Sequence, residues 1–586
     1  MFQLENVIEA KFPDFGRRRG VLARPTLAFL KKVLREKDVN AFLREAEGLE
    51  GMAFIDRILE HFDFSYSVVG REIENIPAEG RVVIVANHPL GMLDGVALLK
   101  LVSEVRRDVR IVANDILMQF KPLHPVLLPI VNLGGGYNKA HIQAIHDALG
   151  RDEAVIIFPS GEVSRAGPFG IRDGRWQAGF LRFAEQARAP LLPVHLDGRN
   201  SALFYSLSTV FKPISTLLLV GEAMRQRGVT LPVRIGEPIA WREIAALTGD
   251  RDRKIRSITR LLYGLPRNRV VQIRTEKTIA RPESRLDLRG ELRRCEPLGR
   301  THDGKDILLF EGSPDCAVMR ELGRLREVTF RQVGEGTGKR RDIDAFDAWY
   351  RHIVLWDETA LQVMGAYRVG DVASIVATRG AEGLYSHGLF AAEEGLRAHY
   401  ANSLELGRSF VQPRYQGLRA LEYLWYGIGA YLRSRPEIRY LFGPVSISAD
   451  YPLEARELLI HFYRRHFGVP ERLCVPRRPF VIPEEREAAL AALIPGTDCA
   501  GEFRTLKRRL AELGVAVPTL YKQYTELCEP GGARFLGFNV DPAFAGCVDG
   551  LVLVDLLRLK PAKRARYLEQ GRIETPGGGE SLLKSA

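Results

Sequence analysis

Two short apolar runs, each ending in a turn that carries polar side chains, place the strongest constraint on the fold of this chain. The run 82–86 (VVIVA) is followed by 87–94 (NHPLGMLD), and the run 154–158 (AVIIF) is followed by 159–165 (PSGEVSR). Apolar runs of this length predict buried strands, and the Pro and Gly residues after them predict non-helical turns. Functional groups in α/β sheets gather at the carboxyl ends of strands, so both turns are candidate parts of one site.

The first of these turns carries a histidine and an aspartate that together can deprotonate a hydroxyl group. The imidazole of His88 takes the proton, while the carboxylate of Asp94 selects the tautomer and stabilises the imidazolium that forms. The alternative is a strand-to-helix turn in which Asn87 and Asp94 only cap backbone groups. On a regular helix His88 and Asp94 would not face each other, so the turn itself must bring them together.

The two turns and a later strand, in this order, resemble the glycerolipid acyltransferase family, which makes lysophosphatidic acid, phosphatidic acid and related lipids. That family carries Asn-His followed by Asp, then a Phe-Pro-Glu-Gly-type block and an apolar strand with a proline. The counterparts here are 87–94, 158–165 and 190–195. The chain departs from the family twice. Five residues, not four, separate the His from the Asp, which is similar to a branch with His-Pro-Leu-Gly-x-Leu-Asp-Gly, and Ser160 stands where the family has glutamate.

This resemblance implies that the first half of the chain transfers an acyl group from a thioester to a lipid hydroxyl. His88 would be the general base and Asp94 would orient it, while backbone N–H groups around Gly91 or in the loop 134–136 would bind the oxyanion. The expected substrate-binding residues of this half are Asn87, Gly91, Ser160, Gly161, Glu162 and Arg165. Loss of the family's glutamate suggests a head group other than a phosphate, and a zwitterionic ornithine head group would use one acidic and one basic partner.

The length of 586 residues exceeds what one hydrophobic core supports, so two domains are expected. Residues 271–304 are highly charged and lack a sustained apolar period, which predicts a linker between an O-acyltransferase domain at 1–270 and a second domain at 305–573. The glycine-rich end, 574–586, predicts a disordered tail.

Strand and helix patterns alternate in both halves, which favours the α/β class for both domains. In the first half we expect strands at 82–86, 110–114, 154–158, 191–196 and 217–220, and helices at 94–106, 141–149 and 174–188. In the second half we expect strands near 307–311, 361–368, 373–378 and 438–445, and helices near 342–352 and 416–434.

The second half carries its own polar cluster, with acidic residues in 342–347 (DIDAFD) and a Glu and an Arg in 405–411 (ELGRSFV). After 405–411 the chain enters a turn with Pro413 and Gly417 and then an apolar helical pattern. Such a turn presents free backbone N–H groups, which suit the phosphate of a phosphopantetheine arm. The alternative is a strand-turn-helix unit that binds nothing.

Four separated blocks of this half resemble the N-acyltransferases that make lyso-ornithine lipid. These enzymes belong to the GNAT superfamily, are related to acyl-homoserine lactone synthases and are often labelled hemolysin-like. The blocks are Asp-x-Phe-Asp at 344–347, Gly-Ala-Tyr-Arg at 365–368, Glu-Leu-Gly-Arg-Ser-Phe-Val at 405–411 and Gly-Pro-Val-Ser at 443–446. The resemblance covers roughly 305–510 and implies a GNAT-like fold.

The second resemblance implies that a 3-hydroxyacyl chain moves from acyl carrier protein to the α-amine of ornithine. It also implies that Asp344, Asp347, Glu405 and Arg408 line the pocket. Glu405 is the candidate base or amine-binding group, and Arg408 is the candidate partner for the amino-acid carboxylate. A buried Glu-Arg pair without a catalytic role is the alternative.

The charge of the chain indicates an acidic partner, because the formal net charge is +12 and the pI is near 9.4. Nucleic acid is not expected, since the basic residues are scattered and no zinc finger, RNA-binding signature or helix-turn-helix pattern is present. Acyl carrier protein and an anionic membrane surface fit better. The segment 203–220 and the basic region 17–36 are candidate membrane contacts; a core strand with its loop and a solvated helix face are the respective alternatives.

The cysteine spacing predicts neither a metal site nor disulfide bonds, and the six cysteines are typical of reduced thiols in a cytosolic protein. The first residues lack the apolar core of a signal peptide, and no stretch of eighteen uninterrupted apolar residues predicts a spanning helix. We therefore expect a cytoplasmic protein that is peripheral on the inner membrane and uses no metal and no cofactor besides acyl-acyl carrier protein.

Together the two resemblances imply a bifunctional acyltransferase that makes ornithine lipid. The second half would form lyso-ornithine lipid, whose free 3-hydroxyl is then the acceptor for the first half. An alternative within enzymes is a lysophospholipid acyltransferase fused to an N-acyltransferase for glycine, lysine or glutamine. A non-enzymatic alternative is a membrane-binding, hemolysin-like protein.

Overall fold

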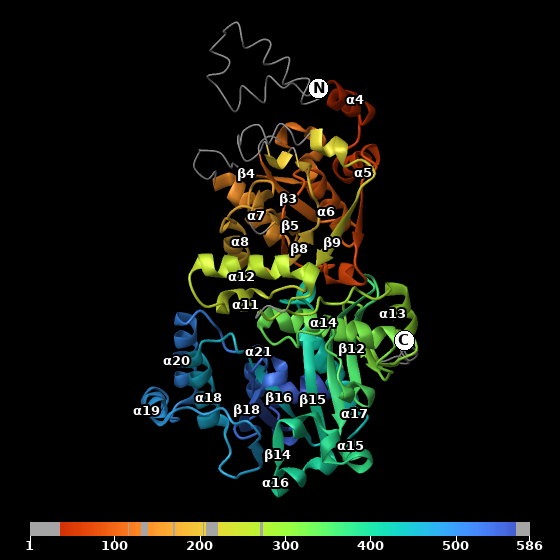
Figure 1. The fold of residues 1–586 in the computed structure, drawn as a ribbon. Coiled ribbons are helices and arrows are strands. Elements are labelled where there is room, and N and C mark those ends of the chain that lie inside the picture. The colour runs from red at the N-terminus through yellow and green to blue at the C-terminus, as the bar shows by residue number, and fades with distance from the viewer. Residues whose placement is uncertain are drawn as a thin grey trace, which may run out of the picture. The chain divides into compact units, whose positions relative to one another are not determined.

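The computed structural model describes residues 36–114, 117–130, 139–167, 170–202, 204–206, 221–269 and 273–569. The chain divides into two compact units, Met1–Thr278 and Ile279–Ala586, drawn from red to yellow-green and from green to blue in Figure 1. The expected tail, the strand at 217–220, the loop 134–136, the region 17–35 and most of the candidate membrane segment at 203–220 lie outside the described residues.

The first unit is built on a mainly parallel sheet with the order β1-β9-β8-β2-β5-β3-β4 in its described part. Its strands are β1 Ser65–Val68, β2 Val82–Ala86, β3 Val109–Asn114, β4 Leu127–Ile130, β5 Ala154–Ile157, β8 Leu191–Leu196 and β9 Thr230–Ile235. A small hairpin, β6 Arg165–Gly167 with β7 Gly170–Arg172, follows β5. β2 lies between β5 and β8 and is parallel to both, so the turns after β2 and β5 meet at one edge of the sheet.

Every residue of β2 is buried, because helices cover both faces of this sheet. Val82, Ile84 and Ala86 pack with helices α5 and α6, whereas Val83 and Val85 pack with α7, α8 and α12. The helices of this unit are α4 Glu36–Glu45, α5 Gly51–His61, α6 Leu93–Ser103, α7 Lys139–Gly150, α8 Gly179–Ala187, α11 Trp241–Ala246 and α12 Arg251–Gly264. Short 3₁₀ turns occur at Glu72–Asn75, Leu117–Gln119, Lys121–Val126 and Leu265–Arg267.

The second unit is built on a sheet with the order β10-β11-β12-β13-β15-β16-β19-β18 in its described part. These strands are β10 Glu296–Arg300, β11 Asp306–Phe310, β12 Arg351–Asp357, β13 Gln362–Asp371, β15 Ser403–Val411, β16 Tyr440–Ile447, β18 Ala533–Asp541 and β19 Cys547–Asp555; β14 Phe390–Ala392 and β17 Cys474–Pro476 form a separate pair. β15 and β16 are parallel and paired only from Ser403 to Glu405, and beyond Glu405 the two strands separate.

Helices cover this second sheet on both faces, with α17 and α18 packed on one face and α14 on the other. The helices are α13 Arg285–Leu292, α14 Ala317–Val333, α15 Val372–Arg379, α16 Glu394–Arg397, α17 Ala420–Arg433, α18 Leu453–Phe467, α19 Glu484–Leu493, α20 Cys499–Glu512, α21 Thr519–Leu527 and α22 Pro561–Arg564. Among the described helices, none combines the length and the apolar character needed to cross a membrane.

Several expected elements differ from the structure. The segment 271–304, expected to be a linker, contains α13 and the edge strand β10, both of which belong to the second unit. The expected helix at 342–352 is a single 3₁₀ turn, Ala345–Ala348, followed by β12, because Asp344 and Asp347 form a capping box and the next residues are apolar and β-branched. The expected strand at 373–378 is helix α15, which Asp371 caps by accepting a hydrogen bond from the Ser374 N–H.

Candidate active sites

The turn after β2 brings His88 and Asp94 together at the carboxyl edge of the first sheet. Nδ1 of His88 lies 3.2 Å from Oδ2 of Asp94, and Asp94 is completely buried in the first turn of α6. Gly91 allows this approach because its φ of +94° lies in the left-handed region, where a Cβ would be strained. The ring of Phe158, the last residue before the second turn, stacks on His88 at a centroid distance of 4.0 Å.

The carboxylate of Asp94 is held ionised by its surroundings. Burial raises the pKa of Asp94, but His88 and the backbone N–H groups of Leu90 and Gly91 lower it, and the balance lies below the ordinary value. Those N–H groups donate to Oδ2 at 2.8 and 3.2 Å. For His88, burial lowers the pKa, but Asp94 and then Asp173 raise it, and the balance lies above the ordinary value. The pair therefore has the electrostatics of a base and its orienter.

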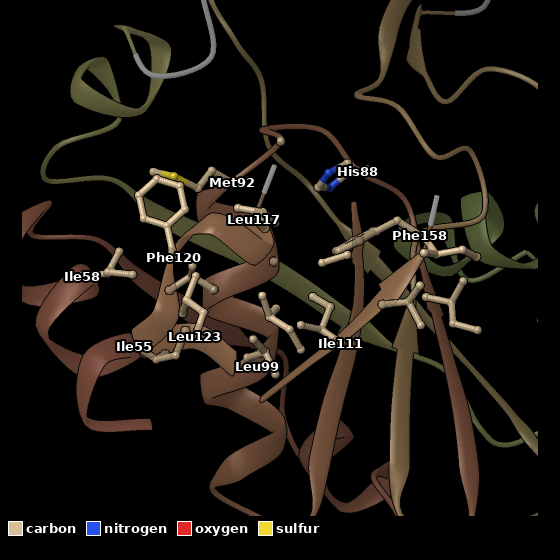
Figure 2. A pocket seen from close by; sticks show the side chains of 18 of the residues that line it. Ile55, Ile58, His88, Met92, Leu99, Ile111, Leu117, Phe120, Leu123 and Phe158 are labelled. Atoms are coloured by element: carbon tan, nitrogen blue, oxygen red, sulfur yellow. The ribbon is translucent and has the colours of Figure 1, made fainter. Parts of the chain in front are cut away.

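His88 lies beside an apolar cavity of about 310 Å³ (Figure 2). Nδ1 faces Asp94, so Nε2 is the ring nitrogen left for a substrate proton. The apolar lining includes Ile55, Ile58, Met92, Leu99, Ile111, Leu117, Phe120 and Leu123. A cavity of this shape and composition suits a hydrocarbon chain, with the imidazole beside it as a polar group.

The polar groups of Asn87 and Gly91 are used within the turn, although Gly91 also lines the cavity. The Asn87 amide donates to the Leu196 carbonyl and accepts from the Leu196 N–H, both at 2.8 Å, so it joins the ends of β2 and β8. The N–H of Gly91 donates to Asp94 and is thus occupied, which removes it as an oxyanion donor. The short polar side chain of Asn87 and the peptide groups of the turn are used to build the turn itself.

The second turn lies next to His88, because the Ser164 N–H donates to the His88 carbonyl at 2.8 Å. Ser160 turns its hydroxyl back to the Glu162 carbonyl at 2.7 Å, and Gly161, with φ +65°, contributes to the cavity lining. Glu162 and Arg165 form a partly exposed ion pair at 2.9 Å. The structure thus places one acidic and one basic group in the second turn, next to the turn that carries His88 and Asp94.

In the second unit, Asp342, Asp344 and Asp347 face a set of buried arginines. Arg408 contacts Asp342 at 2.8 Å and Asp344 at 3.3 Å, which joins β15 to the loop after α14. Arg368 contacts Asp344 at 2.6 Å and Asp347 at 3.2 Å.

A third arginine of this unit, Arg326 of α14, contacts Asp347 at 2.9 Å. Burial raises the pKa of Asp347, but Arg326, His352 and Arg368 hold it well below the ordinary value. The completely buried Asp347 therefore organises this network, while Asp344 remains about one fifth exposed.

Glu405 is fully buried and its carboxylate is already surrounded by donors. The Tyr350 hydroxyl and the backbone N–H groups of Tyr385 and Ser386 donate to it, the latter two at 3.2 and 2.7 Å. These three bonds use most of the about four acceptor positions of a carboxylate and attach Glu405 to the turn at 384–388. The role of Glu405 as the base or the amine-binding group stays a prediction.

Arg408 lies at an irregularity of β15, where the pairing with β13 shifts between Ala366 and Arg368 and φ of Arg408 is +47°. At this bulge the guanidinium of Arg408 reaches Asp342 and Asp344. Its Nη1 donates to the Tyr385 hydroxyl at 2.9 Å. The turn with Pro413 and Gly417 follows β15 and leads directly to the first residue of α17, and Gly417 has φ +80° with open space where a Cβ would lie.

Several residues at these two sites were missed by the sequence analysis. Asp173 belongs to no motif, yet its carboxylate accepts a hydrogen bond from the His88 N–H at 3.1 Å. Arg326, Tyr350 and Tyr385 come from segments without a motif, and Arg368 was part of a quoted block but not among the candidates. Buried polar groups that pair across more than twenty residues leave no local spacing signal in the sequence.

Comparison with known proteins agrees with this division. Residues 6–266 match the family model described as acyltransferase, and residues 325–426 match the model described as acetyltransferase (GNAT) domain. A glycine N(alpha)-acyltransferase of Phocaeicola vulgatus is 30% identical over 316 residues, covering 50% of this chain and 93% of the relative.

Two further relatives represent an O-acyltransferase and an ornithine enzyme. A lyso-glycine lipid O-acyltransferase of Bacteroides thetaiotaomicron is 33% identical over 248 residues, 41% of this chain and 89% of the relative. An L-ornithine N(alpha)-acyltransferase of Rhizobium meliloti is 33% identical over 257 residues, 42% of this chain and 77% of the relative. The chain is therefore a member of the acyltransferases, with an acyltransferase domain in its first half and a GNAT domain in its second half.

Proposed function

We propose that this protein makes ornithine lipid by two acyl transfers. The GNAT domain transfers a 3-hydroxyacyl group from acyl carrier protein to the α-amine of ornithine. The first domain then esterifies the free 3-hydroxyl of the product with a second acyl group. The observation that carries the second step is the contact of His88 with the buried Asp94 at an apolar cavity.

The O-acyl transfer follows from this geometry. Nε2 of His88 removes the proton from the 3-hydroxyl while that oxygen attacks the thioester carbonyl, and the new ester bond forms as the carbon–sulfur bond breaks. The thiolate that leaves takes the proton back from the imidazolium, which Asp94 stabilises in the meantime. The apolar cavity holds a hydrocarbon chain, since burial of each CH₂ contributes about 0.8 kcal/mol. The Glu162–Arg165 pair supplies complementary charges for a zwitterionic head group.

The choice of ornithine is supported by a buried acidic group near Arg408. Asp549 of β19 is fully buried, and burial, then Asp541 and Glu335, raise its pKa to about 8, while Arg408 acts in the opposite direction. A carboxyl group with this pKa is mostly protonated near pH 7, and a second ammonium group on the acceptor would favour its ionised form. Ornithine carries such a group in its side chain, and glycine does not.

Glycine is the second candidate for the acceptor amino acid. It is favoured by the names of two kinds of relative, a glycine N(alpha)-acyltransferase of which 93% is covered and a lyso-glycine lipid O-acyltransferase of which 89% is covered. An N-acylated glycine bears only a carboxylate, for which the Arg165 guanidinium would suffice.

The acyl donor and the place of action are part of the same proposal. Acyl carrier proteins are acidic, and the net charge of +12 favours their approach as well as that of an anionic membrane surface. The protein would act as a peripheral protein on the cytoplasmic face of the inner membrane. Thioester exchange with an amine and with a hydroxyl is balanced in atoms and electrons, so we propose that neither step uses a metal or a further cofactor.

Expression in a host without amino-acid lipids, followed by mass spectrometry of total lipids, tests this function. Feeding labelled ornithine or labelled glycine identifies the amino acid that enters the lipid. The expected result is a diacylated ornithine lipid from the wild type and its monoacylated form from His88→Ala. Changed phospholipids without any amino-acid lipid would contradict the proposal, and equal membrane effects of both variants without new lipids would favour a non-enzymatic protein.

A further inference from the structure

The main chain of His88 is held from both sides by one segment that lies more than seventy residues later. The His88 N–H donates to Oδ1 of Asp173 at 3.1 Å, and the His88 carbonyl accepts from the Ser164 N–H at 2.8 Å. Ser164 and Asp173 flank the β6–β7 hairpin, and the Ser164 hydroxyl joins them by donating to the same Oδ1 at 2.5 Å. Both backbone polar groups of the proposed base are therefore bound outside its own turn.

Asp173 is itself held by two further contacts. The Trp176 indole N–H donates to Oδ2 at 3.0 Å, and the Asp173 N–H donates to the Tyr263 hydroxyl of α12 at 2.9 Å. Burial raises the pKa of Asp173, whereas Ser164, the His88 N–H and Trp176 lower it, and the balance lies above the ordinary value. These donors offset the cost of burying the Asp173 carboxyl group and hold it in one position.

The titratable groups that act on His88 are Asp94 from α6 and Asp173 from the segment after β7. Asp94 contacts the imidazole directly, whereas Asp173 contacts the peptide N–H of the same residue. The two carboxyl groups thus act on different parts of His88. Asp94 selects the tautomer of the imidazole. Asp173 holds the backbone of His88 in position and adds negative charge near the ring.

We propose that Asp173 is a positioning residue for O-acyl transfer, which holds the main chain of His88 in place and adds a second negative charge beside its imidazole. This inference rests on the proposed role of His88 as the base. Displacement of a reacting group by about 1 Å costs roughly 100-fold in rate, so a loosened His88 main chain should lower kcat more than it changes KM.

The experiment compares purified full-length wild type with Asp173→Asn, measuring ester formation from an acyl thioester and an N-(3-hydroxyacyl)ornithine over a range of pH. We expect kcat to fall roughly 10- to 100-fold. We also expect the acid limb of the profile to move to lower pH, because the pKa of His88 loses the raising effect of the Asp173 charge. A merely structural role would change the amount of folded protein but not the position of the acid limb.

Ser164→Ala is the second variant and keeps the inference testable if Asp173→Asn does not fold. It retains the Ser164 N–H bond to His88 but removes the hydroxyl that lowers the pKa of Asp173, so the acid limb should move in the same direction by a smaller amount. Asp152→Asn is the matched control, since Asp152 is exposed, pairs with Arg81 at 2.8 Å and precedes β5 at the opposite edge of the sheet.

The outcomes separate this inference from the proposed function. An active wild type whose kcat and acid limb are unchanged in Asp173→Asn and Ser164→Ala would overturn the role of Asp173. A wild type that forms no ester with the N-acyl ornithine acceptor would instead overturn the proposed acceptor, and the same comparison would then be made with the N-acyl glycine acceptor. A lower kcat and a shifted acid limb in Asp173→Asn, with a smaller shift in Ser164→Ala and no change in Asp152→Asn, support the inference.

Discussion

Nδ1 of His88 and Oδ2 of Asp94 lie 3.2 Å apart although five residues separate them in the chain. The turn closes because the Asp94 carboxylate accepts hydrogen bonds from the N–H groups of Leu90 and Gly91, within the loop that it ends. The same carboxylate therefore builds the turn and orients the imidazole. A substitution at Asp94 therefore affects both the conformation of the turn and the orientation of His88.

Replacing Asp94 with Asn should lower kcat of ester formation roughly 10²- to 10⁴-fold. The Asp94 charge raises the pKa of His88, so its removal lowers that pKa and moves the acid limb of the pH–rate profile to lower pH. Rates measured from about pH 5 to 9 with saturating substrate check both effects. His124→Ala, at an exposed histidine whose ring contacts the Met118 carbonyl, should behave as wild type. An unshifted limb in Asp94→Asn would contradict the assignment of His88 as the base.

Leu99→Phe should shift the second acyl chain of the product toward shorter lengths. Leu99 lines the cavity beside His88, and a larger ring there removes room for the end of a chain. Each CH₂ that no longer fits loses about 0.8 kcal/mol, about fourfold in affinity. Mass spectrometry of the O-linked chains measures the shift. Leu286→Phe, at an exposed leucine of α13, is the control, and an unchanged chain profile in Leu99→Phe would exclude this cavity as the chain site.

Asp549→Asn should lower kcat/KM for N-acylation of ornithine by roughly 10- to 100-fold, the value of a charge-assisted hydrogen bond of 1.5–3 kcal/mol. Activity with glycine, tested in parallel, should change much less, since glycine has no second ammonium group. Steady-state assays with both amino acids and a 3-hydroxyacyl donor give the comparison. Equal losses with both amino acids would show that Asp549 does not select ornithine.

Arg368→Ala should destabilise the GNAT domain by about 3–5 kcal/mol, because the buried Asp347 and the mostly buried Asp344 both lose this partner. Thermal or denaturant unfolding followed by circular dichroism measures the effect. Arg509→Ala is the matched control, since Arg509 forms an exposed pair with Glu512 that should contribute at most about 1 kcal/mol. Similar losses in the two variants would contradict a structural role for the buried network.

Lowering the pH from 7 to 5 should destabilise the GNAT domain through His352. Burial, followed by Arg326 and Arg368, lowers the pKa of His352 to about 4, although Asp347 acts to raise it. Because the unfolded chain takes up the proton near pH 6.5 and the folded chain only near pH 4, stability is lost as the pH falls through this interval, by about 2 kcal/mol between pH 7 and 5. Denaturant titrations of wild type and His352→Gln at both pH values isolate this contribution; an equal pH dependence in both would refute it.

The local patterns were informative where one segment carries the whole signal. The strands β2, β5 and β8 were predicted from apolar runs, and the α/β class of both domains is confirmed. The prediction of a helix at 342–352 was wrong because a capping box was followed by a strand rather than by further helical turns. The charge of 271–304 suggested a linker, but α13 needs only Leu288 and Leu292 to attach to the core around α14.

The sequence by itself determined the residue types at each strand end and therefore the chemistry of acyl transfer, because those types follow directly from short motifs. Only the tertiary structure decided which polar groups remain available. Asn87 is bound by Leu196, Glu405 by Tyr350 and Ser386, and the main chain of His88 by Ser164 and Asp173. These partners are distant in sequence, and buried polar groups must find hydrogen bonds wherever the fold supplies them. A motif therefore names the candidates for a site, whereas the long-range hydrogen bonds decide which of them face the substrate.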